Sequence, residues 1–186
     1  MYAGVGAGLT LVVAGCTDSG HGTPGAGSAV DRRDSGVTSP STSHTWSRAE
    51  AAQEQATQAY RGMWQDMATE AETSNWQSPL LARHATGEAL GAITRGMYAD
   101  HLNGLITKGE PKNSPSVTQI SPSADPAVVL ISDCGDSTHW LKYRKRTGQL
   151  ADDAPGGRQQ ITAEVKKQDD GTWKVARFAV EGVGSC

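Results

Sequence analysis

The apolar side chains of the first half of the chain recur every three or four residues, which is the spacing of amphipathic helices. Ser47 and Glu50 have the spacing of a capping box at the start of a helix. Ser78 followed by Pro79 indicates a second helix start, and Gly104 fits the end of a third helix. The predicted helices cover 47–72, 80–84 and 86–101.

The pattern changes after Gly104 to short alternating or continuous apolar runs. Ile161, Ala163 and Val165 alternate with polar residues, which predicts a strand with one buried face. Asp170-Gly171 fits a hairpin turn. The predicted strands lie at 115–120, 127–131, 140–146, 161–166 and 173–179. Helices followed by strands predict an α+β domain in which N-terminal helices pack on a curved antiparallel sheet.

The N-terminal segment 1–15 has no charged side chain, and its apolar stretch 9–14 is far shorter than the roughly 20 residues that cross a bilayer. This pattern is typical of a signal peptide. Val13-Ala14-Gly15-Cys16 resembles the lipobox of bacterial lipoproteins, in which the peptide is cut before Cys16 and its thiol is acylated. The basic n-region is missing, because Arg32 is the first Lys or Arg. The alternative is a buried apolar strand with a chance cysteine.

The segment 16–46 is rich in Gly, Ser, Thr and Pro and has no apolar periodicity. Such a composition predicts a flexible tether, which at this length reaches roughly 30 Å. The predicted organisation is therefore a signal peptide over 1–15, a tether over 16–46 and a folded domain over 47–186. If Cys16 carries lipid, this domain lies on the extracytoplasmic face of the cell membrane, and the bilayer is its first partner.

The chain has three cysteines, and the lipobox assigns Cys16 to the lipid. Cys134 and Cys186 remain as an even pair in an oxidising compartment, which predicts a disulfide between them. Two free thiols are one alternative. A metal site with His139 is another, although no paired ligand spacing supports it.

The order of helices, strands and final hairpin resembles the NTF2-like, or cystatin-like, superfamily, and small secreted actinobacterial lipoproteins of that type. The matching residues are Tyr60-x-x-Met63-Trp64, Asp133-Cys134-Gly135-Asp136, and Gly171-Thr172-Trp173-Lys174-Val175 with Cys186. The resemblance implies a cone-shaped fold with a pocket between sheet and helices. The side chains that we expect around such a pocket are Tyr60, Trp64, Trp76, Tyr98, His101, Trp140 and Tyr143.

Enzymes of this superfamily use a pocket Asp, Tyr or His as acid or base, and the candidates here are Asp66, Asp100, His101 and Asp133. Asp66 and Asp100 lie off the apolar stripes, so we expect solvated helix-surface charges. His101 is predicted to be a favourable charge at a helix C-terminus. Asp133, with Asp136, is expected to make turn hydrogen bonds.

The net charge of −3 and the pI of about 5.9 give no basic footprint for nucleic acid. No nucleophile motif, phosphate-binding loop or zinc spacing is present, so we expect neither a cofactor nor a catalytic site. The basic run Lys142, Arg144, Lys145 and Arg146 is interpreted as a solvated strand face, with contact to anionic lipid or wall polymer as the alternative.

The function expected from the sequence is that of a non-catalytic extracytoplasmic module that binds a small apolar ligand or an envelope protein. Two alternatives stay open. One is an enzyme of the NTF2-like type, an isomerase or hydrolase. The other is a structural accessory protein of the envelope. A pocket that holds an acid or base without a salt partner would favour the enzyme, and a filled cone would favour the structural protein.

Overall fold

The computed structural model describes residues 47–151 and 156–186. The predicted signal peptide, the predicted lipidation site Cys16 and the predicted tether lie outside the described residues. Within these two ranges, no helix combines the length and the apolar character that a bilayer crossing requires.

The described residues form the three helices that the sequence predicts, with ends that differ from the predicted ranges by at most one residue. They are α1 (Arg48–Ala71), α2 (Leu81–His84) and α3 (Gly87–Leu102). The capping box at α1 is confirmed: the backbone N–H of Ser47 donates to Glu50 Oε2 at 2.7 Å, and that of Glu50 donates to Ser47 Oγ at 3.2 Å. This pair satisfies two backbone donors that a helix start otherwise leaves unbonded.

Six strands follow, all paired in antiparallel fashion. Their bounds are β1 (Leu105–Lys108), β2 (Ser116–Ser121), β3 (Val128–Asp136), β4 (Leu141–Arg144), β5 (Arg158–Lys167) and β6 (Trp173–Val180). One sheet has the strand order β2-β3-β5-β6, and β1 pairs with β4 in a second, two-stranded sheet. The predicted α+β class is confirmed, but β1 was not predicted, and β3 and β5 are longer than expected.

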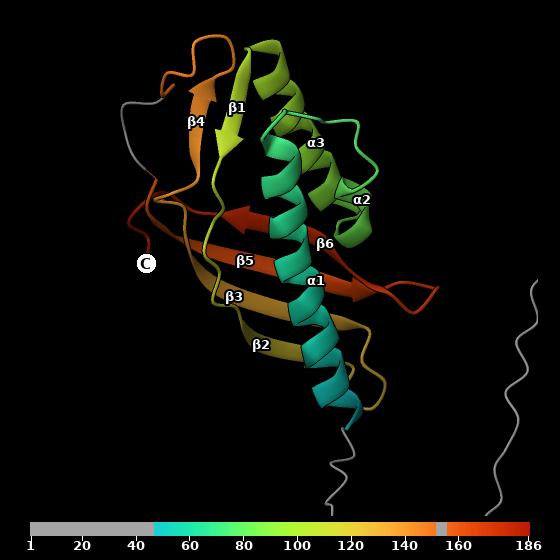
Figure 1. Ribbon diagram of the computed structural model, residues 1–186. Helices are drawn as coiled ribbons and strands as arrows, with labels where there is room; N and C mark the ends of the chain where they lie inside the picture. Colours follow the sequence, from blue (N-terminus) through green and yellow to red (C-terminus); the bar gives the residue numbers. More distant parts are fainter. Residues whose placement is uncertain (1–46, 152–155) are drawn as a thin grey trace, which may run out of the picture. The chain divides into compact units, whose positions relative to one another are not determined.

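The core lies between α1, α3 and the inner face of the four-stranded sheet. Figure 1 shows α1 lying across that sheet, with β1 and β4 at the end where α1 finishes. Alternate residues of β3 and β5 face the helices, among them Val129, Ile131 and Val165, which are almost fully buried. Register shifts in β2–β3 and in β5–β6 mark two bulges, which increase the twist of a sheet.

A disulfide joins Cys134 to Cys186, with a Cα–Cα distance of 5.9 Å, and confirms the predicted bridge. The bridge excludes the two alternatives for these cysteines, which were a pair of free thiols and a metal site with His139. Cys134 lies inside β3, two residues before its end, and not at the start of a turn. After β6 the tail continues beside β5, where the N–H of Gly184 donates to the Arg158 oxygen at 2.7 Å. The bridge therefore fastens the last residue across β5 to the centre of the sheet.

Candidate functional site

A cavity of about 290 Å³ opens between the two helices α1 and α3 and the strands β1, β4 and β6. Its walls are formed mainly by apolar and small side chains. The lining residues are Met67, Ala71, Ala92, Ile93, Gly96, Met97, Asp100, Thr107, Trp140, Lys142 and Phe178. Elements from both ends of the chain therefore build one apolar cavity, which we call the α3 pocket.

Aromatic rings form one side of the α3 pocket and support it from behind. Trp64 contacts Trp140 edge to face, with ring centroids 6.0 Å apart, and contacts Phe178 at 5.7 Å. Edge-to-face pairs of this kind contribute about 0.5–1.5 kcal/mol each beyond the area that they bury. The indole nitrogens of Trp64 and Trp140 are buried and have no hydrogen-bond acceptor among the described residues. These rings are therefore held by packing.

Polar groups lie at only one place in the pocket, where β1 and β4 meet α3. The Lys142 ammonium donates to both carboxylate oxygens of Asp100, at 2.6 and 2.9 Å. Thr107 is 6% exposed, and its hydroxyl forms no hydrogen bond within the described ranges. An apolar ligand with one polar end group would find its only polar partners at this rim.

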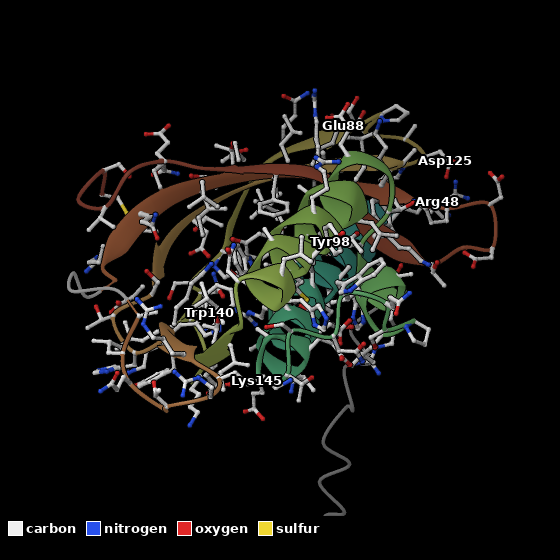
Figure 2. All side chains as sticks on the ribbon, turned by 90° about the horizontal axis from the view of Figure 1, so that it is seen from above. Arg48, Glu88, Tyr98, Asp125, Trp140 and Lys145 are labelled. Carbon is white, nitrogen blue, oxygen red and sulfur yellow. A yellow bond between two sulfur atoms is a disulfide. The ribbon has the colours of Figure 1, made fainter. Side chains whose placement is uncertain are left out.

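The seven side chains predicted to surround a pocket do not gather around this one. Only Trp140 lines it, and Trp64 lies behind Trp140. Trp76 packs edge to face on Tyr98, which is 44% exposed on α3. His101 is exposed, and the Tyr143 ring lies under the Lys108 ammonium, so neither side chain lines the pocket. Tyr60 is fully buried and does not line it either. In Figure 2, Tyr98 lies on α3, and Trp140 lies apart from it, beside the C-terminal end of that helix.

Tyr60 and Asp133 form a separate buried polar cluster, in which Tyr60 lies seven residues before the pocket residue Met67 on the same face of α1. The Tyr60 hydroxyl and Asn113 Nδ2 donate to Asp133 Oδ2 at 2.9 and 2.7 Å, and the N–H of Ser114 donates to Oδ1 at 2.8 Å. Burial, and then the charge of Asp133, raise the pKa of Tyr60 well above its ordinary value. The prediction of turn hydrogen bonds for Asp133 was wrong, because β3 continues to Asp136 and turns the Asp133 side chain inward.

A second carboxylate, Asp66 on α1, is 1% exposed, so the prediction of a solvated surface charge was wrong. Its oxygens bind Arg83 Nη2 at 2.6 Å and His84 Nδ1 at 2.7 Å, both on α2. The His84 ring packs against Gly62, where a Cβ would lie 2.6 Å from ring atoms. Asp66 thus fastens α2 to α1. Asp100 also has a partner, Lys142, although it is only partly buried.

A wider hollow of about 520 Å³ lies on the outer face of the four-stranded sheet. Its wall includes Glu164 and Arg177, which are joined by an ion pair at 2.9 Å. This hollow is shallower and more open than the α3 pocket, and one sheet alone supplies its wall. Because small-molecule sites are concave and mainly apolar, we take the α3 pocket as the candidate site.

The sequence did not predict most of the pocket lining. The residues that were missed include Met67, Ile93, Met97 and Phe178. Met67, Ile93 and Met97 do lie on the predicted apolar stripes of α1 and α3. The spacing of a stripe does not distinguish side chains that meet the sheet from those that face an opening. Phe178 turns inward only because the bulge in β6 shifts its register against β5.

The chain matches no protein-family model and no curated protein. Similar solved structures include the intermembrane-space region of the chloroplast protein ARC6, at 15% identity and a TM-score of 0.44 over 69% of this chain and 95% of that chain. A ketosteroid isomerase-like protein from Erwinia carotovora is similar at 11% identity and a TM-score of 0.42, over 69% and 93% of the two chains. A cystatin-like protein from Nostoc punctiforme is similar at 9% identity and the same TM-score, over 69% and 92%.

Proposed function

We propose that this chain is a lipid-anchored, extracytoplasmic, non-catalytic binding protein that takes a small apolar ligand with one polar end group into the α3 pocket. The observation that carries the proposal is the lining of that pocket. Apolar walls from α1, α3 and β6 meet a single polar rim formed by Thr107, Asp100 and Lys142. The lipobox at Cys16 supports the location.

The size and chemistry of the pocket limit the ligand. Ligand sites commonly have volumes of about 300–1,000 Å³, so this pocket of about 290 Å³ suits a small molecule. Each square ångström of apolar ligand surface that leaves water contributes roughly 25 cal/mol. The Thr107 hydroxyl and the third N–H of Lys142 are donors that orient a carbonyl, hydroxyl or carboxylate group at the rim.

The state of the carboxylates supports binding rather than catalysis. A general base needs a pKa tuned to its task and a free position for the proton that it takes. Asp133 already accepts three hydrogen bonds and does not line the pocket. Asp66 is bound by Arg83 and His84, and Asp100 by Lys142. The enzyme alternative would require Asp100 to leave Lys142 when substrate binds.

A larger side chain at the wall of the pocket is expected to weaken ligand binding without loss of stability. Gly96 lines the cavity, and no atom lies within 4 Å of the position that its Cβ would take, so the backbone at Gly96 has room for the first carbon of a leucine side chain at the pocket wall. The full chain should bind an apolar fluorescent probe such as N-phenyl-1-naphthylamine, and Gly96→Leu should bind it at least about tenfold more weakly. Replacing a helical glycine also stabilises α3 by roughly 0.5–1 kcal/mol.

Gly91→Leu is the matched control, because Gly91 lies on the same helix and does not line the pocket. A Cβ at Gly91 meets only the end of the flexible Arg95 side chain, at 3.1 Å. This variant should gain similar stability and keep probe affinity. Equal probe affinity in Gly96→Leu and the wild type would rule out the α3 pocket as the binding site.

The location is tested by Cys16→Ala. Without the thiol there is no acylation, so the variant should lose palmitate labelling and move from the membrane fraction to the soluble fraction. The membranes are washed at about 1 M salt, where the Debye length is about 3 Å and electrostatic contacts are screened. The control is Cys134→Ala with Cys186→Ala, which should stay membrane-bound. Unchanged fractionation and labelling of Cys16→Ala would refute the lipid anchor.

A further inference from the structure

One end of the domain carries a cluster of basic and apolar side chains that the proposed function does not use. We call Leu102, Arg144, Lys145, Arg146 and Leu150 the basic tip. The backbone holds these residues together: the N–H of Lys145 donates to the Gly104 oxygen and that of Arg144 to the Gln149 oxygen, both at 2.8 Å. Figure 2 shows Lys145 beside the C-terminal end of α3. The tip is thus a defined surface formed by two segments.

Negative charge is absent from the two segments that form the tip. The chain has a net charge of −3, yet neither 101–109 nor 137–151 contains an Asp or Glu. Arg144, Lys145 and Arg146 are exposed and form no ion pair with any residue in the described ranges. The acids that follow, Asp152 and Asp153, lie outside those ranges. The three cations of the tip therefore present a positive surface on an acidic protein.

Two leucines accompany these cations, and both are exposed. Leu102 is 65% exposed at the end of α3, and Leu150, which is 45% exposed, bridges to Tyr143 of β4. Exposed leucines do not strengthen the binding of a soluble polyanion, because a polyanion offers no apolar surface against which they can be buried. Cations together with aliphatic side chains are typical of protein surfaces that lie in the interface of an anionic bilayer.

We infer that the basic tip binds the surface of an anionic phospholipid bilayer. Each Lys or Arg near such a surface is attracted to the anionic headgroups, and the leucines add apolar burial among them. Asp100 and Lys142, at the rim of the α3 pocket, lie two residues before Leu102 and Arg144. Tip binding therefore places the polar rim of the pocket beside the bilayer.

This orientation is compatible with the proposed anchor. α1 begins at the end of the domain opposite the two-stranded β1–β4 sheet, as Figure 1 shows, and its 24 residues rise by roughly 36 Å. A tether of about 30 residues spans at most roughly 100 Å when extended. The acyl group on Cys16 and the tip can thus reach the same bilayer.

The experiment uses the full chain with Cys16→Ser, so that no acyl anchor contributes, and measures co-sedimentation with vesicles at low salt. Binding should be at least about tenfold tighter to vesicles with phosphatidylglycerol than to pure phosphatidylcholine vesicles. Arg144→Glu with Lys145→Glu and Arg146→Glu should remove that preference. Leu102→Ser with Leu150→Ser should weaken binding about threefold or more and keep its salt dependence. Circular dichroism checks that each variant is folded.

The matched control reverses three exposed charges elsewhere, with Arg61→Glu, Arg95→Glu and Lys167→Glu, and makes the same change in net charge. This variant should keep at least half of the wild-type affinity. The inference is overturned if wild-type protein shows no preference for anionic vesicles, or if the control loses as much affinity as the tip variant. Tip-dependent binding to soluble polyglutamate without vesicle binding would assign the tip to a polymer and also overturn it.

Discussion

Replacing Cys134 and Cys186 by Ala is expected to lower the free energy of unfolding by about 4 kcal/mol. The bridge closes a loop with a sequence separation of 52, which removes many conformations from the unfolded chain. It also fixes the tail that pairs with Arg158 and Gln160 of β5. A loss of this size is a large share of the 5–15 kcal/mol that is typical of a domain. Urea unfolding followed by tryptophan fluorescence measures it.

Reductant and the single variants provide the controls for this prediction. Cys134→Ala alone should cost about as much as the double variant, because either change breaks the same bond. Dithiothreitol should destabilise the wild type to the same level and leave the double variant unaffected. Two alkylatable thiols in the purified, non-reduced protein, or a loss below about 1 kcal/mol, would show that the bridge does not hold the domain.

Asp133→Ala is expected to cost at least about 3 kcal/mol of unfolding free energy. The change leaves the Tyr60 hydroxyl, Asn113 Nδ2 and the Ser114 N–H without their acceptor in an interior where Tyr60 is fully buried. Each buried donor left unpaired costs about 1–3 kcal/mol. Tyr60→Phe should cost less, about 1–2 kcal/mol, because Asp133 keeps its other two donors. Urea unfolding of both variants measures the difference.

The raised pKa of Tyr60 adds a pH test of the same cluster. The folded state keeps Tyr60 protonated at a pH where an unfolded tyrosine, with its ordinary pKa of 10.0, ionises. Stability from this group is therefore complete below pH 10 and decreases as the pH rises above it. Tyr60→Phe should lose less stability than the wild type between about pH 9 and 11. An equal loss in both proteins would place the alkaline instability elsewhere.

Local signals in the sequence were sufficient for much of the fold. The capping box of Ser47 and Glu50 gave the start of α1 to within one residue, because a helix start depends on side chains close in sequence. The disulfide was predicted because the proposed lipidation of Cys16 leaves an even pair of cysteines. The strand β1 was missed because Leu105–Lys108 has only four residues and pairs with the distant β4, a contact that no local pattern contains.

The candidate site was harder to predict because it depends on packing between distant elements. Asp66 lies off the apolar stripe of α1. It is buried because α2 packs on this part of α1 and brings Arg83 and His84 to its carboxylate. Asp133 follows a run of apolar residues and turns inward only because β3 continues past Ile131. The aromatic residues were predicted to share one pocket wall because of their chemical type alone. In the structure Tyr60 is fully buried, whereas Tyr98 is exposed on α3.

Native mass spectrometry of the protein, purified in detergent from the cells that produce it, tests the central claim of ligand binding most directly. The wild type and Gly91→Leu should carry the same additional non-covalent mass of a small apolar molecule, which organic solvent removes. Gly96→Leu, which adds a side chain at the wall of the α3 pocket, should lack that mass while remaining folded. The same bound mass in all three proteins, or none in any of them, would contradict the account.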